Sequence, residues 1–382
     1  MSVMVDQHRK ADARGWAALG ALMFPVLLVS VNNTALSFAL PAISAGLRPT
    51  AAQLLWIVDI YPLVLAALLI PMGSLGDRIG RRKMLIIGSS GFGLVSLGAA
   101  FAPSAEWLLA ARVGIAVFGS MLLPTTLSLL RTVFQDDRQR SLAIAIWTAG
   151  FSAGAALGPI AGGFLLNHFW WGSVFLLAVP VLIAFLIAAP LLLPESRNPH
   201  PGPVDPASIV LAILTMAPIV YGIKTLATGG SALHGALFIA VGALSGLLFA
   251  RRQVVKDYPM LDLRFFRSPR FSGGLSVNVV SNVAMFGFLF FLTQHLQLVS
   301  GMDPMTSGLF MVPGLLLAIV AGLTAAKLAY TIGLRNAVVL GLLLVALGFL
   351  LVFFTDQQAS ALPVLGGFTV MSAGVGIATT LS

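Results

Sequence analysis

Long apolar segments constrain this chain more than any other feature of its sequence. Twelve stretches of about 20 mostly apolar residues follow one another between short polar connections, and about 20 residues suffice for a helix to cross a bilayer. The predicted spans are 16–41, 52–72, 84–102, 107–130, 141–166, 173–193, 207–224, 232–250, 272–298, 305–326, 336–354 and 361–382. A membrane barrel would show ten-residue segments of alternating polarity instead. The sequence therefore predicts an all-α polytopic membrane protein.

Composition agrees with this class and excludes several chemistries. Hydrophobic residues make up 58% of the chain and charged residues 9%, against about 25% charged in a typical soluble domain. The chain has no cysteine, which excludes disulfides, thiolate catalysis and Cys-ligated metals. Its net charge of +9 is explained by cytoplasmic loops that collect Lys and Arg, so no nucleic-acid partner is predicted. The first apolar run is too long for a signal peptide and is expected to remain as a helix.

The distribution of basic residues predicts the orientation. With a cytoplasmic N-terminus, 19 of the 22 Lys and Arg residues fall in inner segments, Arg9 and Lys10 among them. Arg48 and Lys224 fall on the outer side, and Arg112 lies within the fourth span. This asymmetry is the positive-inside pattern.

A glycine-rich, charged stretch, 73–83, separates the second and third spans. We interpret it as a tight hairpin turn at the inner surface. Asp77 opposes the positive-inside pattern and therefore needs another explanation: a latch with Arg78 and Arg81. The alternative is a solvated basic turn that only sets topology, the role that we predict for Arg82 and Lys83.

Weak internal repeats predict a duplicated architecture. Ile79-Gly80-Arg81-Arg82 and Ile332-Gly333-Leu334-Arg335 are each followed by a glycine eight residues after their own. Val113-Gly114-Ile115-Ala116 returns as Val375-Gly376-Ile377-Ala378. Spans 9–12 thus repeat spans 1–4, as in transporters built from same-sense repeats, and spans 7 and 8 form an inserted pair.

The repeat defines four predicted regions. They are an N-terminal six-helix half (1–193), a connector with the inserted helix pair (194–250), an inner interfacial linker (251–271) and a partial C-terminal half of four helices (272–382). The last two helices of the second half are expected after Ser382. The linker mixes basic and aromatic residues, so it either lies on the membrane interface or forms a basic solvated loop.

Several of these stretches resemble motifs of one transporter family. Gly73-Ser-Leu-Gly-Asp77-Arg78-Ile-Gly80-Arg81-Arg82 is similar to the signature between helices 2 and 3 of the major facilitator superfamily. Its drug:proton antiporters, especially the fourteen-helix branch of quaternary-ammonium exporters, are resembled at 31–41, 53–61, Arg112 with Gly119 and Pro124, and 150–163. Two positions depart from that branch: Asn32 replaces an acidic residue, and Ile115-Ala116 replace Gln-Gly.

The resemblance implies a fold and a function. The expected fold is the major facilitator fold, with two six-helix halves around a central site. The expected protein is a monomeric, multi-pass protein of the cell membrane that exports lipophilic, cationic drugs in exchange for protons and so confers drug resistance. Membrane lipid is its other partner; no cofactor, metal or enzymatic activity is expected. The alternatives are a metabolite exporter or importer of the same fold and, less favoured, a receptor or a membrane-embedded enzyme, which would need paired acids in its spans.

Three polar residues at matched depth are the candidates for proton coupling. Asp59 is the only carboxylate within the predicted spans, and an intramembrane acid indicates function by default. Arg112 and Asn32 lie at similar distances from the outer ends of their spans, so we predict an outer polar cluster in which protonation of Asp59 weakens an Arg contact. The alternatives are an interfacial Asp59 and an Arg112 that snorkels to the surface.

Span 5 carries glycines at four-residue spacing, hence on one helix face: Gly150, Gly154, Gly158 and Gly162, with Pro159 among them. Small residues let helices approach closely in lipid, and proline bends a helix. Close packing alone explains the pattern; the functional alternative is a seam along which the two halves rock.

Candidate substrate contacts are aromatic, soft or polar residues within the spans, because aromatic faces attract organic cations and methionine adapts to varied shapes. These residues are Trp56, Tyr61, Met121, Trp147, Phe151, Gln294, His295 and Gln297. The alternative for each is ordinary packing or interfacial anchoring.

Overall fold

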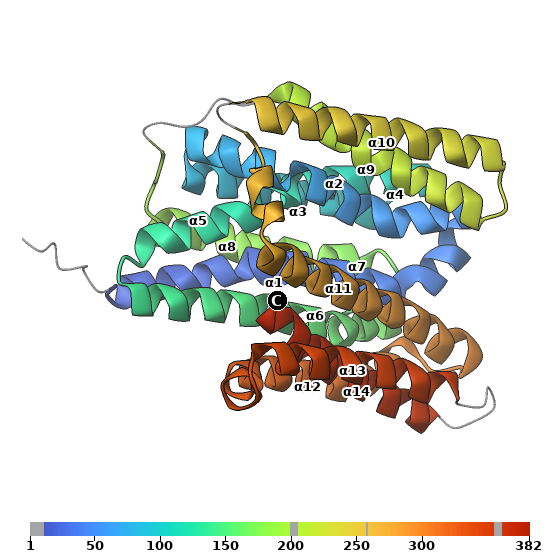
Figure 1. Ribbon diagram of the computed structural model, residues 1–382. Helices are drawn as coiled ribbons and strands as arrows, with labels where there is room; N and C mark the ends of the chain where they lie inside the picture. Colours follow the sequence, from blue (N-terminus) through green and yellow to red (C-terminus); the bar gives the residue numbers. More distant parts are fainter. Residues whose placement is uncertain (1–10, 199–204, 257–258, 355–360) are drawn as a thin grey trace, which may run out of the picture. The chain divides into compact units, whose positions relative to one another are not determined.

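A computed structural model describes residues 11–198, 205–256, 259–354 and 361–382 (Figure 1). Within these ranges the chain is helical and contains no strand. The elements are α1 (Ala13–Leu47), α2 (Ala51–Ile79), α3 (Arg81–Ala100), α4 (Ala105–Gly119), α5 (Leu122–Val133), α6 (Asp137–His168), α7 (Ser173–Leu176), α8 (Ala178–Leu192), α9 (Pro206–Ala227), α10 (Ala232–Val255), the 3-10 helix η1 (Leu263–Arg267), α11 (Pro269–Gln294), the π-helix η2 (His295–Val299), α12 (Pro304–Ile332), α13 (Leu334–Phe353) and α14 (Ala361–Leu381). Arg9, Lys10 and parts of the connector and linker lie outside the described residues.

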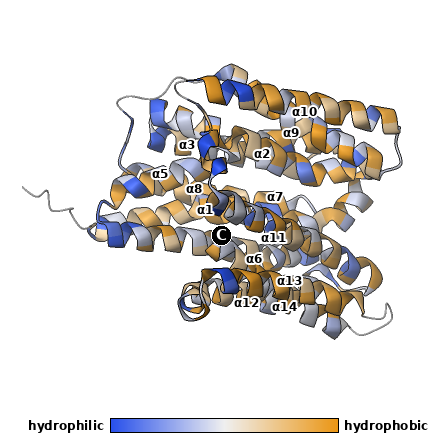
Figure 2. Ribbon diagram, viewed as in Figure 1, coloured by the Kyte–Doolittle hydropathy of each residue, from blue (hydrophilic) through white to orange (hydrophobic). Residues whose placement is uncertain are grey.

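Twelve helices of the described chain are long and apolar enough to cross a membrane, which confirms the predicted number and order of spans. Figure 2 shows their largely hydrophobic colouring. Two of the predicted spans are interrupted, which the sequence reasoning did not foresee. The fourth breaks between α4 and α5, and the sixth breaks between α7 and α8. Pro124 and Pro180 follow these breaks, and neither can donate to the carbonyl four residues earlier.

The predicted turn at 73–83 is wrong in extent. Helix α2 continues to Ile79 and α3 begins at Arg81, so Gly80 alone links them. Its φ of 113° belongs to a region that only glycine occupies without strain. Gly73 and Gly76 are helical, and the lack of a side chain lets α2 approach α5 closely: an added Cβ would lie 3.2 Å from Pro124 Cβ and 3.1 Å from Thr125 Oγ1, respectively.

The local geometry supports the predicted repeat. Gly333, with φ 86°, is the only residue between α12 and α13, just as Gly80 is between α2 and α3. The partners of the two following glycines also correspond. A Cβ on Gly88 would lie 3.0 Å from the Leu122 side chain in the fourth span, and one on Gly341 would lie 3.0 Å from Gly374 O in the twelfth.

Contacts divide the chain into two compact units. One contains Met1–Val29, Leu47–Phe151 and Phe175–Leu263; the other contains Ser30–Gly46, Ser152–Val174 and Arg264–Ser382. The C-terminal parts of α1 and α6 therefore belong with α11–α14, and Phe38 joins a core that includes Phe288 and Phe368. The predicted region boundaries remain predictions.

The inserted pair α9–α10 is a close-packed hairpin whose helices lie side by side (Figure 1). Gly222 and Gly242 permit this approach, since an added Cβ would lie 2.5 Å from Gly235 O and 2.8 Å from Thr215 O, respectively. Both ends of the pair carry ion pairs, which are described below.

Candidate functional site

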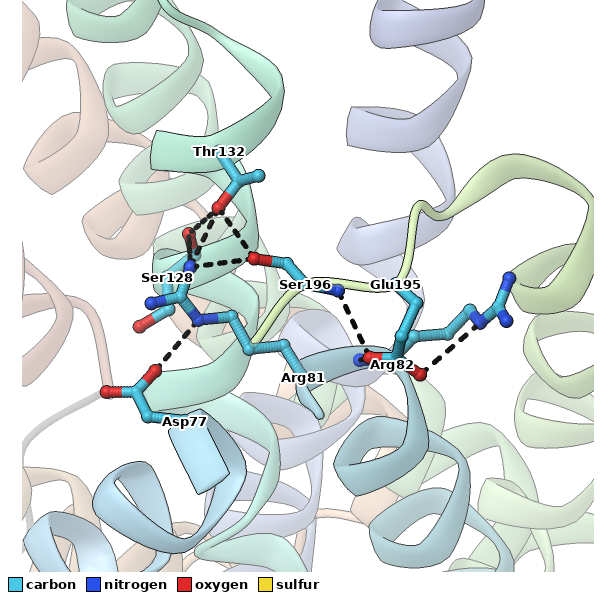
Figure 3. Close-up of polar contacts among 7 residues, drawn as sticks. All are labelled: Asp77, Arg81, Arg82, Ser128, Thr132, Glu195 and Ser196. Carbon is cyan, nitrogen blue, oxygen red and sulfur yellow. Dashed lines mark hydrogen bonds and ion pairs between the residues drawn. The ribbon is translucent and has the colours of Figure 1, made fainter. Parts of the chain in front are cut away.

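The inner candidate group surrounds Arg81 (Figure 3). Asp77 and Arg81 are one helical turn apart across the Gly80 link, and Arg81 Nε donates to Asp77 Oδ1 at 2.8 Å. The same guanidinium donates through Nη1 to Thr132 Oγ1 at 2.7 Å and to Ser196 Oγ at 3.3 Å. Of the predicted latch, the structure brings together Asp77 and Arg81, whereas Arg78 is exposed.

The connector after α8 closes this group. Its backbone joins the hairpin twice: Arg81 N donates to Ser196 O and Asn198 N donates to Asp77 O, each at 2.9 Å. Glu195 accepts from Arg82 N at 3.2 Å, and its carboxylate lies 3.8 Å from Arg82 Nε. The prediction that Arg82 only sets topology is therefore wrong, because it holds the connector against α3.

A cavity of about 330 Å³ adjoins the inner group. Asp77, Ser74, Ser128 and Asn198 supply its polar wall. The carboxylate of Asp77 is 31% exposed and therefore accessible from this cavity while it is bonded to Arg81.

The outer candidate group is built on Arg112 of α4, whose side chain is buried, with 1% of the residue exposed. Its Nε donates to Ile57 O at 3.0 Å and its Nη2 to Val58 O at 3.4 Å. The guanidinium also lies 4.5 Å from the ring centroid of Tyr61, a cation–π contact. Arg112 does not snorkel: it clamps α4 onto the backbone of α2.

Pro62 accounts for the position on α2 at which Arg112 binds the backbone. Within a helix, the carbonyl of residue 58 accepts from the N–H of residue 62, and proline has none. Arg112 supplies a donor to Val58 O in its place. The kink-prone turn of α2 is thereby held by a charge from α4.

Asp59 has a partner that the sequence reasoning did not foresee. Its Oδ2 lies 2.7 Å from Lys224 Nζ on α9, so a residue assigned only to the outer loop charge pairs with the one carboxylate predicted within a span. Asn32 is buried in the other compact unit. Its predicted grouping with Asp59 and Arg112 remains a prediction.

The glycine face of α6 makes close contacts within the second unit. A Cβ on Gly158 would collide with Thr34 and lie 3.1 Å from Ala35 N of α1, and one on Gly162 would lie 3.3 Å from Ala35 O. Gly308 of α12 lies against Pro159 of α6, so closely that a Cβ added to Gly308 would collide with Pro159 O. Gly150 lies in the first unit against the flexible end of Met23, and Gly154 is buried. Gly158 and Gly162 thus let α6 pack closely against α1, and Gly308 lets α12 pack closely against α6.

The candidate substrate residues fall into separate places. The rings of Trp147 and Phe151 are stacked with their centroids 6.4 Å apart, and Trp147 Nε1 donates to Thr126 Oγ1 at 3.1 Å. Met121 and Tyr61 are buried, and Trp56 packs against α9.

The polar cluster of span 9 contains the irregular helix. His295 opens the π-helix η2, a geometry often found at functional sites. Gln297 donates to Phe38 O at 3.4 Å, whereas Gln294 Nε2 is buried without a hydrogen-bond partner in the described part of the chain.

Two functional contacts escaped the sequence reasoning, and one had a usable signal. Glu195 is an acid in a basic segment that the charge pattern predicts to be on the inner side, the same anomaly that drew attention to Asp77. Lys224 carried no such signal, because a basic residue at the end of a span is common.

Comparisons with known proteins agree with this architecture. The Major Facilitator Superfamily profile matches residues 22–382. Multidrug efflux pump LfrA of Mycolicibacterium smegmatis is 50% identical over 98% of this chain and 74% of that protein. Methyl viologen resistance protein SmvA of Salmonella typhimurium is 36% identical over 94% of this chain and 74% of that protein. The solved structure of peptide transporter POT in complex with sulfate shares the fold, with TM-score 0.65 and 18% identity over 94% of this chain and 79% of that one.

The fold and the buried polar groups define a multi-pass membrane protein of the transporter class. The chain belongs to the Major Facilitator Superfamily. Its similarity to efflux and resistance proteins confirms the expected drug-exporter branch, and the count of fourteen helices remains a prediction.

Proposed function

We propose that this protein exports lipophilic, cationic drugs across the cell membrane in exchange for protons, with its N-terminus in the cytoplasm. The observation that carries the proposal is its 50% identity, over 98% of the chain, to a multidrug efflux pump. The relative named for methyl viologen resistance supports a cationic substrate, because methyl viologen is an organic dication. Drugs, protons and lipid are then its partners, and a monomer suffices.

The geometry supports a division of roles between the two polar groups. Asp59 is the proton carrier, because its carboxylate can exchange an ion pair with Lys224 for a proton. Arg112 holds the backbone next to Asp59 through Ile57 O and Val58 O. Asp77 and Arg81 form the inner latch. The Asp77 carboxylate must separate from Arg81 when the latch opens, and the adjoining cavity gives access to that carboxylate.

Candidate drug contacts that face neither ion pair occur in each of the two compact units, and each unit is considered by itself. Trp147 and Phe151 offer stacked rings for a planar cation. Gln294 offers a buried donor without a partner in the described chain.

Ethidium efflux from energised cells tests the proposal. Cells expressing the protein should expel ethidium faster than control cells, and an uncoupler should abolish the difference. Efflux that persists after the proton gradient collapses would exclude proton antiport. No ethidium efflux at all, with a transported metabolite found instead, would favour a metabolite exporter of the same fold.

A further inference from the structure

The outer end of the inserted pair is attached to α2 by one concentrated set of contacts. Lys224, in the last turn of α9, places Nζ 2.7 Å from Asp59 Oδ2 and donates to Leu55 O at 2.9 Å. The same ammonium lies 4.4 Å from the ring centroid of Trp56. Tyr221, one turn earlier, stacks on Trp56, with the ring centroids 6.2 Å apart. Two side chains of α9 thus enclose the stretch of α2 that carries Asp59.

Among the charged groups around Asp59, Lys224 is the direct counterion. Arg112, on α4, is the other cation nearby, but its Nε and Nη2 donate to the carbonyls of Ile57 and Val58. Lys224 is the more enclosed member of the ion pair, with a side chain 16% exposed against 44% for Asp59. A proton can therefore reach the carboxylate, whereas the ammonium stays covered by aromatic rings.

We infer that Lys224 is a positioning residue for proton coupling: it competes with the proton for the Asp59 carboxylate and links that exchange to the inserted helix pair. When Asp59 accepts a proton on Oδ2, the carboxylate becomes a neutral acid and the ion pair with the Lys224 ammonium is lost. When the proton leaves, the pair re-forms. The inserted pair is thus a working part of the exchange. The inference rests on the proposed function, because it takes Asp59 as the proton carrier.

A purely structural anchor would behave differently, and the same helix pair provides the control. At its opposite end, Asp205 is bound by Arg252 through two hydrogen bonds of 2.9 and 3.0 Å and by Lys256 at 2.7 Å. Ser208 also donates to this carboxylate. This cluster fixes the pair without touching Asp59. Its loss should lower stability and leave the proton dependence of transport unchanged.

The test is the pH dependence of ethidium transport by the full chain in proteoliposomes. Lys224→Met removes the cation that pairs with the Asp59 carboxylate, so the pH midpoint of ethidium transport should rise. Lys224→Arg should keep the wild-type midpoint, and so should Arg252→Gln.

Asp59→Asn separates the possible outcomes. It should remove the proton dependence, and adding Lys224→Met to it should shift nothing further. An unshifted midpoint in Lys224→Met, with the same loss of thermal stability as Arg252→Gln, would reduce Lys224 to an anchor and overturn the inference. The same holds if Lys224→Met shifts the midpoint equally with and without Asp59. Transport by the wild type that ignores pH and the proton gradient would overturn the proposed function itself, and this is visible before any variant is made.

Discussion

Replacing Arg112 should lower the free energy of unfolding by less when Pro62 is also replaced. Arg112→Met takes the donor away from Val58 O, whose own helical partner is missing because residue 62 is a proline. In a Pro62→Ala background the new backbone N–H can donate to Val58 O and repair the helix. Pro62 is exposed, so its replacement by alanine loses little packing.

The size of this coupling follows from the contacts. An unsatisfied buried acceptor costs about 1–3 kcal/mol, and the Arg112 Nη2 bond to Val58 O is long, at 3.4 Å and only partly buried. We therefore expect about 1–1.5 kcal/mol, at the lower end of that range. The lost bond to Ile57 O and the lost contact with Tyr61 occur in both backgrounds and cancel in the double-mutant cycle.

The cycle is measured by unfolding the purified protein in mixed micelles and following tryptophan fluorescence. Pro71→Ala provides the matched control, since Pro71 is also inside α2 but is not the proline that deprives Val58 O of its donor. Its effect should add to that of Arg112→Met. If Pro62→Ala is likewise additive, within about 0.3–0.5 kcal/mol, Arg112 does not compensate for the proline.

Three further predictions concern packing, strain and pH. Gly158→Val should lower stability by about 1–3 kcal/mol through overpacking and abolish efflux, whereas Gly287→Val, which meets open space, should do neither; equal melting temperatures would contradict this. Gly80→Ala and Gly333→Ala should each cost about 1–3 kcal/mol of backbone strain, measured by thermal unfolding. Gly80→Ala should cost more, because its Cβ would lie 2.6 Å from a carboxylate oxygen. Hydrogen bonds and the ion pairs with two basic residues hold the pKa of Asp205 below its usual 3.8. This carboxylate therefore stabilises the fold above that value, and its contribution is lost as the pH falls through and below it. Acid unfolding of Asp205→Asn should lack this part of the pH dependence, and an unchanged curve would show that the ion pairs contribute nothing.

The spans could be predicted because each is a local property of composition and length. The repeat of Ile79-Gly80-Arg81-Arg82 at Ile332-Gly333-Leu334-Arg335 was visible in the sequence, but the reduction of each link to a single glycine was not. The breaks before Pro124 and Pro180 could have been predicted from the missing proline N–H.

The partners of the charged residues could not be predicted in the same way. Asp59 pairs with Lys224, 165 positions later, and only the packing of α9 on α2 reveals it. Arg112 binds the carbonyls of Ile57 and Val58, of which Val58 O lacks its helical donor because residue 62 is a proline. Backbone acceptors have no signature in the sequence, so a buried cation can be placed by depth but its partner cannot.

The two glycine links share a backbone geometry but not the chemistry around it. Gly80 and Gly333 share a similar unusual backbone geometry, yet the residues around them differ: Asp77 and Arg81 lie three before and one after Gly80, where Tyr330 and Leu334 lie relative to Gly333. The two hairpins therefore resemble each other in backbone and differ in chemistry, so a substitution that is silent in the second hairpin can be damaging at the corresponding place in the first.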